Sequence, residues 1–459
     1  MRVSYGEARK HARAIGAALI EMGLGAEQPL LVLSENSIEH GLISLACVYV
    51  GIPYAPVSPA YSLVSKDHAK LKDIAALLKP GAIFADDGAA FAPALAAISN
   101  TETVIINHRL GSAKALEFDD LLAHDPNAAE KARNAVRPET VVKYLFTSGS
   151  TGTPKAVINT NGMICANQAM VRDCYRFLES EPPVALDWAP WNHTAAGNKV
   201  SYMVLTNGGA CYIDDGKPSP SGMAETLRNL REIACTWYFN VPAGYDRLVE
   251  ELEVDPQLAS TFFSLLRMIF YAGAGMAKHA WDRLAAVGHK TTGRDVLIST
   301  SPGATETAPF ALAWTEIEST AGNVGVPARG LTLKLVETGG KLELRLKDPS
   351  ITPGYHGDPE NTEAAFDDEG FCKMGDVLRP VDPNDFSRGF FFDGRIAVNF
   401  KLATGSATHI RRALILEAAP SFDRGKLTEK GSLNQRALRA NNADTIAALY
   451  DNRDGVIRV

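Results

Sequence analysis

The stretch from 144 to 159, YLFTSGSTGTPKAVIN, places small hydroxyl and glycine residues directly after an apolar run. Such a loop offers backbone N–H groups at close approach together with hydroxyl donors, and Lys155 adds a positive charge. These are the parts of a phosphate-binding site. It is not a Walker A loop, because the spacing G-x-x-x-x-G-K-[ST] cannot be read through Gly149, Gly152 and Lys155. On these residues alone, phosphate binding and an ordinary surface loop fit the stretch equally well.

The residues before this loop predict a doubly wound α/β sheet. Ser4 and Glu7 form a capping box, and apolar residues then recur at helical spacing as far as Met22, which predicts a helix of about five turns. Short apolar runs follow (LLVL, YAPV, AIFADD and TVIIN), with helical segments between them. In such sheets ligands bind beyond the carboxyl ends of strands. The run that ends at Phe146 would deliver the loop to that edge.

A second architecture begins after Gly330. Leucines at 331, 333 and 335, and again at 342, 344 and 346, alternate with other residues around Gly339 and Gly340. A period of two around a glycine pair predicts an antiparallel hairpin.

Length and composition narrow the class of protein. The chain has 459 residues, of which 46% are apolar and 22% charged, so we expect at least two domains. The net charge of −7 gives no reason to expect a nucleic-acid partner. Six scattered cysteines without a CxxC pair argue against a disulfide framework or a zinc site and favour a reducing cytosol. The longest apolar stretch, 42–57, is interrupted by glycine and proline, so we expect neither export nor a membrane span.

The loop resembles the phosphate-binding signature of the adenylate-forming superfamily, which includes acyl-CoA synthetases, luciferases and peptide-synthetase adenylation domains. Further segments occur in that family's order: PWNHTAAGN (190–198), YAGAGM (271–276), PGATETAP (302–309), GD (375–376), GR (394–395) and, near the end, KGSLNQRA. Within the superfamily, LDWAPWNHT, YIDDGKP and LTEKGSLNQRA look most like the feruloyl-CoA synthetase type, which activates hydroxycinnamic acids.

The resemblance implies an ATP-dependent acid–CoA ligase. The carboxylate of a small aromatic acid would attack the α-phosphate of ATP, and coenzyme A would then displace AMP from the acyl-adenylate. Mg²⁺ would accompany the phosphates. Neither a nucleic acid nor a membrane is an expected partner, and the oligomeric state stays open, with a homodimer as the commonest arrangement.

The resemblance also implies a domain organisation. A large domain at 1–396 would combine doubly wound mixed sheets with an antiparallel, β-barrel-like subdomain at about 323–396. A shortened α+β domain at 397–459 would carry a mobile lysine.

Site residues are assigned by matching the family's motifs. The pyrophosphate loop matches Thr147, Ser148, Gly149, Ser150, Thr151, Gly152 and Lys155. Thr305 and Glu306 match a Thr-Glu pair whose glutamate helps to hold Mg²⁺. Asp376 matches the carboxylate that accepts the ribose hydroxyls, and Arg395 a cation that contacts ribose or phosphate.

The remaining assignments concern the adenine base of ATP, the acid substrate and the mobile lysine. Gly273, Ala274 and Gly275 would lie beside adenine, and His193 would border the acyl pocket. Lys430 stands in the family's KGxxNQR frame and would approach the α-phosphate, whereas the nearby Lys426 lies outside that frame. Three aromatic residues, Tyr238, Phe239 and Tyr245, are weaker candidates for lining the acid pocket, because aromatic residues at such spacing also form plain core.

The chain departs from the family pattern in several places. Ala156 replaces a glycine, Pro302 replaces an aromatic residue, and the structure that normally precedes the first helix is missing. The stretch FKLATG, which ends at Gly405, runs almost directly into SATHIRR. The feruloyl-CoA synthetases separate these two stretches by a long section. Two alternatives to the full ligase therefore stay open: an enzyme that only adenylates, and a catalytically impaired protein that binds nucleotide or aromatic acid.

Overall fold

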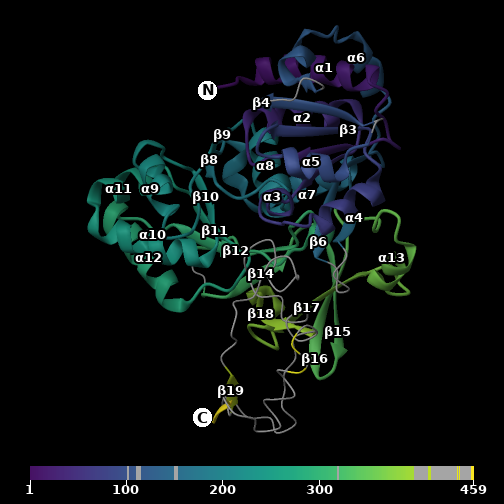
Figure 1. The fold of residues 1–459 in the computed structure, drawn as a ribbon. Helices are drawn as coiled ribbons and strands as arrows, with labels where there is room; N and C mark the ends of the chain where they lie inside the picture. The colour runs from purple at the N-terminus through teal and green to yellow at the C-terminus, as the bar shows by residue number, and fades with distance from the viewer. Residues whose placement is uncertain are drawn as a thin grey trace.

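The computed structural model describes residues 1–100, 103–109, 115–148, 154–317 and 320–396, together with 412–414, 442, 444 and 456–458. Its three larger sheets are two that are flanked by helices and one that is antiparallel, and two further sheets have two strands each (Figure 1). The predicted α/β fold, with mixed sheets and an antiparallel half-barrel, is confirmed. The chain from 397 onwards, where the shortened domain was predicted, falls almost entirely outside the described residues.

The first sheet has seven strands in the order β5-β4-β3-β1-β2-β6-β7. Its strands are β1 (Leu30–Leu33), β2 (Tyr54–Val57), β3 (Ala82–Asp87), β4 (Val104–Arg109), β5 (Leu116–Glu117), β6 (Val141–Ser148) and β7 (Pro154–Thr160). All neighbours pair in parallel except β6 and β7, which are antiparallel. The sheet is therefore mixed.

Helices cover both faces of this sheet, which explains the unbroken apolar run of β1. Leu30 and Val32 belong to one buried cluster with α1 (Tyr5–Glu21) and α2 (Ile38–Val50). Leu31 and Leu33 belong to another with α4 (Ala69–Leu78) and α5 (Ala92–Ile98). The predicted capping box at Ser4 and Glu7 starts α1. Further short helices in this part of the chain are α3 (Pro59–Leu63), η1 (Phe118–Ala123), α6 (Asn127–Arg133), α7 (Asn161–Cys174) and η2 (Arg176–Glu179).

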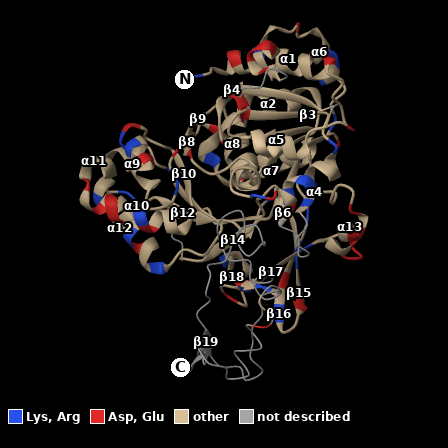
Figure 2. Ribbon diagram, viewed as in Figure 1, with Lys and Arg blue, Asp and Glu red and all other residues tan. Residues whose placement is uncertain are grey.

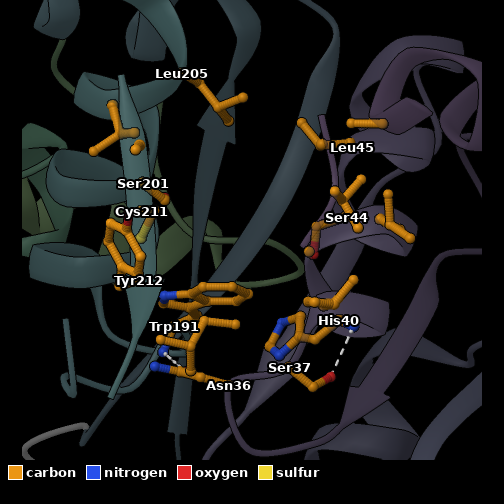
Figure 3. Close-up of a pocket in the computed structure, with 18 of the residues that line it drawn as sticks. Asn36, Ser37, His40, Ser44, Leu45, Trp191, Ser201, Leu205, Cys211 and Tyr212 are labelled. Atoms are coloured by element: carbon orange, nitrogen blue, oxygen red, sulfur yellow. Dashed lines mark hydrogen bonds between the residues drawn. The ribbon is translucent and has the colours of Figure 1, made fainter. Parts of the chain in front are cut away.

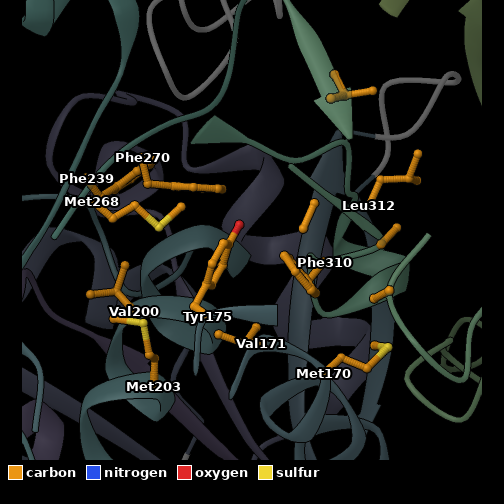
Figure 4. Close-up of a cluster of buried hydrophobic side chains, with 14 of the residues drawn as sticks. Met170, Val171, Tyr175, Val200, Met203, Phe239, Met268, Phe270, Phe310 and Leu312 are labelled. Carbon is orange, nitrogen blue, oxygen red and sulfur yellow. The ribbon is translucent and has the colours of Figure 1, made fainter. Parts of the chain in front are cut away.

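The second layered unit contains parallel strands with large aromatic residues. A two-stranded sheet pairs β8 (Val184–Asp187) with β9 (Ala210–Ile213), and a three-stranded sheet contains β10 (Trp237–Asn240), β11 (Met268–Tyr271) and β12 (Leu297–Thr300). Alternate residues of β10 and β11 face two different cores. Figure 4 shows one of these cores, in which Phe239, Met268 and Phe270 contribute beside Tyr175 and Phe310.

The outer helices of this unit are α9 (Met223–Glu232), α10 (Pro242–Val254), α11 (Pro256–Ser264) and α12 (Lys278–Thr292). Figure 2 shows basic and acidic residues interspersed along them. Arg283 pairs with Glu253, and Arg231 with Asp255, so these surface charges act mainly on one another.

The third sheet is antiparallel, with the order β13-β14-β18-β17-β16-β15. Its strands are β13 (Leu312–Ala313), β14 (Asn323–Pro327), β15 (Thr332–Thr338), β16 (Lys341–Lys347), β17 (Cys372–Pro380) and β18 (Phe390–Arg395). The predicted leucine hairpin is confirmed, because β15 and β16 pair throughout. Gly339 and Gly340 have φ angles of 59° and 76°, the left-handed backbone that a tight two-residue hairpin turn requires.

The other elements are short. They are η3 (Ala195–Val200), which is a π-helical turn, α8 (Ser201–Thr206), η4 (Thr305–Thr307), α13 (Pro359–Ala365), η5 (Phe386–Arg388), β19 (Arg412–Leu414) and β20 (Val456–Arg458). All six cysteines carry free thiols. In the described ranges, every helix is too short or too polar to cross a bilayer.

Candidate active site

A cavity of about 670 Å³ gathers residues from the ends of all three sheets. Its lining includes most of the residues that the sequence motifs selected: Thr147, Lys155, His193, Gly273, Ala274, Gly275, Thr305, Glu306, Asp376 and Arg395. These positions are spread over about 250 residues of sequence, so only folding brings them together. The side chain of Ser148, and Gly149, Ser150, Thr151, Gly152 and Lys430, lie outside what the structure describes.

Lys155 reaches the cavity from a strand and not from a helix. Strand β6 extends past Phe146 to Ser148, and β7 begins at Pro154, so the hydroxyl-rich segment connects two antiparallel strands. Thr147 pairs directly with Lys155, which places both side chains on one face of the sheet. Lys155 Nζ donates a hydrogen bond to Asn361 Oδ1 at 2.5 Å and lies 4.9 Å from the centre of the Tyr355 ring. The amine is thus held by neutral groups that an anion can displace or share.

Glu306 is anchored by the segment that follows β16. Tyr355 Oη donates to Glu306 Oε1 at 3.0 Å, and the backbone N–H of Thr352 donates to the Glu306 carbonyl at 2.8 Å. Burial raises the pKa of Tyr355, and the Glu306 carboxylate adds to the rise. Tyr355 therefore stays protonated and can donate. One carboxylate oxygen is fixed in this way, and the half-buried side chain remains part of the cavity wall.

Asp376 and Arg395 form an ion pair between neighbouring strands. The two residues are register partners of β17 and β18, and Arg395 Nε lies 2.8 Å from Asp376 Oδ1. Burial raises the pKa of Asp376, while the charge of Arg395 and its hydrogen bond lower it. The carboxylate side chain is only 6% exposed, whereas that of the arginine is 57% exposed. The pair presents an acceptor and a cation side by side.

His193 stands directly before η3, a π-helical turn. The backbone N–H of Ala195 donates to His193 Nδ1 at 3.3 Å. π-Helical turns are rare and occur often at functional sites. This one also depends on Gly197, because a Cβ there would lie 2.1 Å from the Trp191 carbonyl oxygen. The turn exposes Ala195 and Lys199 to the cavity.

The weaker aromatic candidates do not line this cavity. Tyr238 and Tyr245 are fully buried in the core beneath α10, and the Tyr245 hydroxyl lies 2.9 Å from the carbonyl oxygens of Tyr238 and Phe270. Phe239 packs in the other core. Because successive residues of β10 face two buried layers, none of these side chains has access to a ligand.

The motifs did not select three residues of this neighbourhood: Tyr355, Asn361 and Lys199. Tyr355 and Asn361 are linked to the site by contacts with Glu306 and Lys155 that are distant in sequence. The sequence contains one indication that Lys199 is unusual: it is a charged residue shortly before the apolar run of α8.

A second cavity, of about 840 Å³, lies on another side of η3. Figure 3 shows His40 and Trp191 next to one another in its wall, where their rings meet edge to face with centres 5.3 Å apart. Burial lowers the pKa of His40 to about 4, so the imidazole is neutral at pH 7. Trp191 and Gly197 of the segment 190–198 line it, but none of the described residues that the motifs assign to the site does. The adenylate-type residues therefore belong to the smaller cavity alone.

The fold is that of an α/β protein, and one of its cavities gathers the site residues that the motifs selected. The family model described as "AMP-binding enzyme" matches residues 1–356, and the chain belongs to this family.

Named relatives are distant. The chain is 27% identical over 302 residues to "4-coumarate-CoA ligase 2" of Narcissus pseudonarcissus, which covers 62% of this chain and 50% of the relative. It is 24% identical over 387 residues to "Feruloyl-CoA synthase" of an Amycolatopsis species, with coverage of 82% and 70%. The solved structure of ATP-bound MatB from Rhodopseudomonas palustris superposes with a TM-score of 0.68 at 22% identity, covering 86% of this chain and 74% of that one.

The match to the Narcissus protein spans half of that protein's length. At these identities the solved structure establishes the fold, and the family match establishes membership.

Proposed function

We propose that the chain is an ATP-dependent acid–CoA ligase that activates a hydroxycinnamic acid of the coumarate or ferulate type through an acyl-adenylate. The observation that carries this proposal is the convergence of Lys155, Glu306, Asp376 and Arg395 on one cavity. The names of the distant relatives support the choice of acid.

In the first step, a carboxylate oxygen of the acid attacks the α-phosphorus of ATP, the bond to the bridging oxygen breaks, and pyrophosphate leaves. Such a reaction needs positioned reactants and stabilised charge on phosphate oxygens. Lys155 would supply a positive charge beside the pyrophosphate, and its neutral contacts with Asn361 and Tyr355 leave that charge available.

Glu306 would be the protein ligand of Mg²⁺. Magnesium in nucleotide sites is usually bound by one or two carboxylates together with substrate phosphates. The Glu306 carboxylate lines the cavity and receives one hydrogen bond from Tyr355, which orients it. The residues present therefore fit the ion, and its contribution would be to offset charge on the phosphates.

Asp376 would accept hydrogen bonds from the ribose hydroxyls, and Arg395 would keep that buried carboxylate ionised. The segment 273–275 would lie beside adenine. His193 would border the acyl group, and Lys430 would approach the α-phosphate.

In the second step, the sulfur of coenzyme A attacks the acyl carbon and the bond to the AMP oxygen breaks. The thiol proton is lost, and AMP leaves. Residues beyond 396 would take part in this step.

The test is a single reaction that contains ferulate, ATP, Mg²⁺ and coenzyme A, with AMP, feruloyl-AMP and feruloyl-CoA separated by chromatography. Formation of feruloyl-CoA is the expected result. Accumulation of feruloyl-AMP would identify an enzyme that only adenylates.

If a folded sample forms neither product, the proposal is overturned for this acid. A thermal-shift titration with ATP would then detect a protein that binds nucleotide without turnover, because a ligand of the folded state raises the melting temperature.

A further inference from the structure

Lys199 is a buried amine in the wall of the candidate active site. Its residue is 2% exposed, and it lines the cavity from the π-helical turn η3. Within the part of the chain that the structure describes, Nζ has no hydrogen-bond partner. A buried polar group without a partner costs free energy, so a lysine at this position calls for an explanation.

Lys143 provides a contrast within the same region. It is also buried, but its Nζ donates to the Gly197 carbonyl at 2.7 Å and to Asn198 Oδ1 at 2.9 Å. Lys143 therefore has a structural role, since it holds the backbone of η3. Lys199 makes no such bond in the described part of the chain, so its amine does not hold the backbone in this way.

Aromatic rings surround the amine. Nζ lies 3.4 Å from the centre of the Phe270 ring, 4.5 Å from that of Phe310 and 5.8 Å from that of Tyr175. Figure 4 shows these three rings in one buried cluster. Burial lowers the pKa of Lys199 well below its usual value, and the neighbouring Cys174 thiol, whose pKa burial raises to about 11, is neutral. Burial thus disfavours the charged form of the amine, and no group in the described part of the chain uses its hydrogen-bonding capacity.

Lys199 lies on a different element from the groups that are suited to bind phosphate and ribose. Those groups, Lys155, Glu306, Asp376 and Arg395, lie on β7, η4, β17 and β18. Lys199 lies on η3 beneath Phe270, in surroundings that suit an aromatic ring and not a triphosphate.

We propose that Lys199 selects the acid substrate, because its Nζ forms a hydrogen bond with a phenolic hydroxyl at the end of the acid that is distal to the reacting carboxylate. This inference rests on the proposed function and specifies its substrate class: an aromatic acid with a ring hydroxyl. A second carboxylate is the less suitable partner, because the rings of Phe270, Phe310 and Tyr175 surround the amine and would offer a buried negative charge no further hydrogen bonds.

The test compares 4-hydroxycinnamate with cinnamate, which differ only in the hydroxyl. The wild type is expected to have a kcat/KM for adenylation, measured by pyrophosphate release, about tenfold or more higher for the hydroxylated acid. In Lys199→Met this preference is expected to fall to about one, mainly through loss of activity with 4-hydroxycinnamate. Since Met removes a buried polar group, its melting temperature should equal or exceed that of the wild type.

Two controls separate a substrate contact from a structural effect. Lys143→Met should lower the melting temperature and affect both acids alike, because that amine bonds to the backbone of η3. Lys199→Gln, which retains a polar end group, should restore part of the preference for the hydroxylated acid.

Equal activity of the wild type with both acids, or an equal loss with both in Lys199→Met, would overturn the inference. So would a clear preference of the wild type for a dicarboxylic acid. If no acid releases pyrophosphate, the proposed function fails, and equilibrium dialysis of the two acids still decides the role of Lys199. Tighter binding of 4-hydroxycinnamate that disappears in Lys199→Met would support it, and equal binding would exclude it.

Discussion

Arg395 donates a hydrogen bond from Nε to Asp376 Oδ1 across the paired strands β18 and β17, at a distance of 2.8 Å. An exposed guanidinium thus stabilises the charge of a carboxylate that burial would otherwise favour in its protonated form. The sheet register fixes the two groups relative to one another before any ligand arrives. A preformed acceptor of this kind can bind hydroxyl groups at little cost in reorganisation.

Arg395→Met should therefore weaken nucleotide binding. Without the cation, the pKa of Asp376 rises further and the carboxylate accepts hydrogen bonds less well. We expect the KM for ATP to rise about tenfold. Arg379→Met is the matched control, since Arg379 lies on the neighbouring strand β17, where its guanidinium is 4.8 Å from the centre of the Phe391 ring. Equal KM values in wild type and Arg395→Met would contradict this assignment.

Lys155→Met should lower kcat for pyrophosphate release by about a hundredfold or more, since it removes a charge that stabilises the leaving group. Asn361→Ala tests the anchor of the same lysine and should have a smaller effect, because the amine keeps its place over the Tyr355 ring. Lys373→Met, on the exposed side of β17, is the control for loss of a lysine. An unchanged kcat in Lys155→Met would remove this residue from the site.

Glu306→Gln should raise the Mg²⁺ concentration required for half-maximal activity, because an amide is a weaker ligand for a hard cation than a carboxylate. Tyr355→Phe keeps the carboxylate but removes the hydrogen bond that orients it, so a smaller shift in the same direction is expected. Both shifts can be measured in Mg²⁺ titrations at saturating ATP. Superimposable titration curves would show that Glu306 does not bind the ion.

Lys430 and Lys426 form a natural pair for testing the mobile-lysine assignment. Both lie outside the described residues, and only Lys430 stands in the KGxxNQR motif. Lys430→Ala should lower acyl-adenylate formation by about a hundredfold, whereas Lys426→Ala should have little effect. Rates of pyrophosphate release in the absence of coenzyme A isolate this step. The opposite ranking of the two variants would transfer the role to Lys426.

Asp187 should make stability depend on pH. Burial raises its pKa to about 7, and the charge of Asp214 acts in the same direction. Between about pH 4 and 7 the folded state holds a proton that the unfolded state has released, so the wild type loses up to about 1.4 kcal/mol of stability for each unit by which the pH rises.

Asp187→Asn lacks this titration. The stability of the wild type relative to Asp187→Asn should therefore fall from pH 4 to pH 7, as measured by urea unfolding at several pH values. Burial lowers the pKa of His40 to about 4, which has the opposite effect, but it acts equally in both proteins and cancels in the comparison. Parallel stability curves would contradict the raised pKa.

Local patterns in the sequence predicted much of the fold. The capping box at Ser4 and Glu7 and the glycine pair at 339–340 depend on neighbours within a few residues, so propensity and spacing were sufficient. The apolar run at 30–33 predicted a strand of a doubly wound sheet, and β1 is such a strand, with buried clusters on both of its faces.

Other features depend on contacts between distant parts of the chain. The motif at 147–155 identified Lys155, but its partner Asn361 lies 206 residues away. Burial of Lys199 beneath Phe270 likewise results from packing between η3 and β11, which no local pattern encodes. Tyr238 and Tyr245 were weak candidates, because the sequence does not distinguish an aromatic residue that lines a site from one that packs in the core. Both belong to a buried core cluster.

Because β6 and β7 pair in an antiparallel register, the position of Lys155 depends on the number of residues between the two strands. Thr147 and Lys155 lie opposite one another in the register of β6 and β7. Side chains alternate between the faces of a strand, so a shift of one position would turn the Lys155 amine towards the opposite face of the sheet. A change in the number of residues between the two strands that shifted their register by one position would therefore remove the lysine from the cavity without altering any residue that lines it.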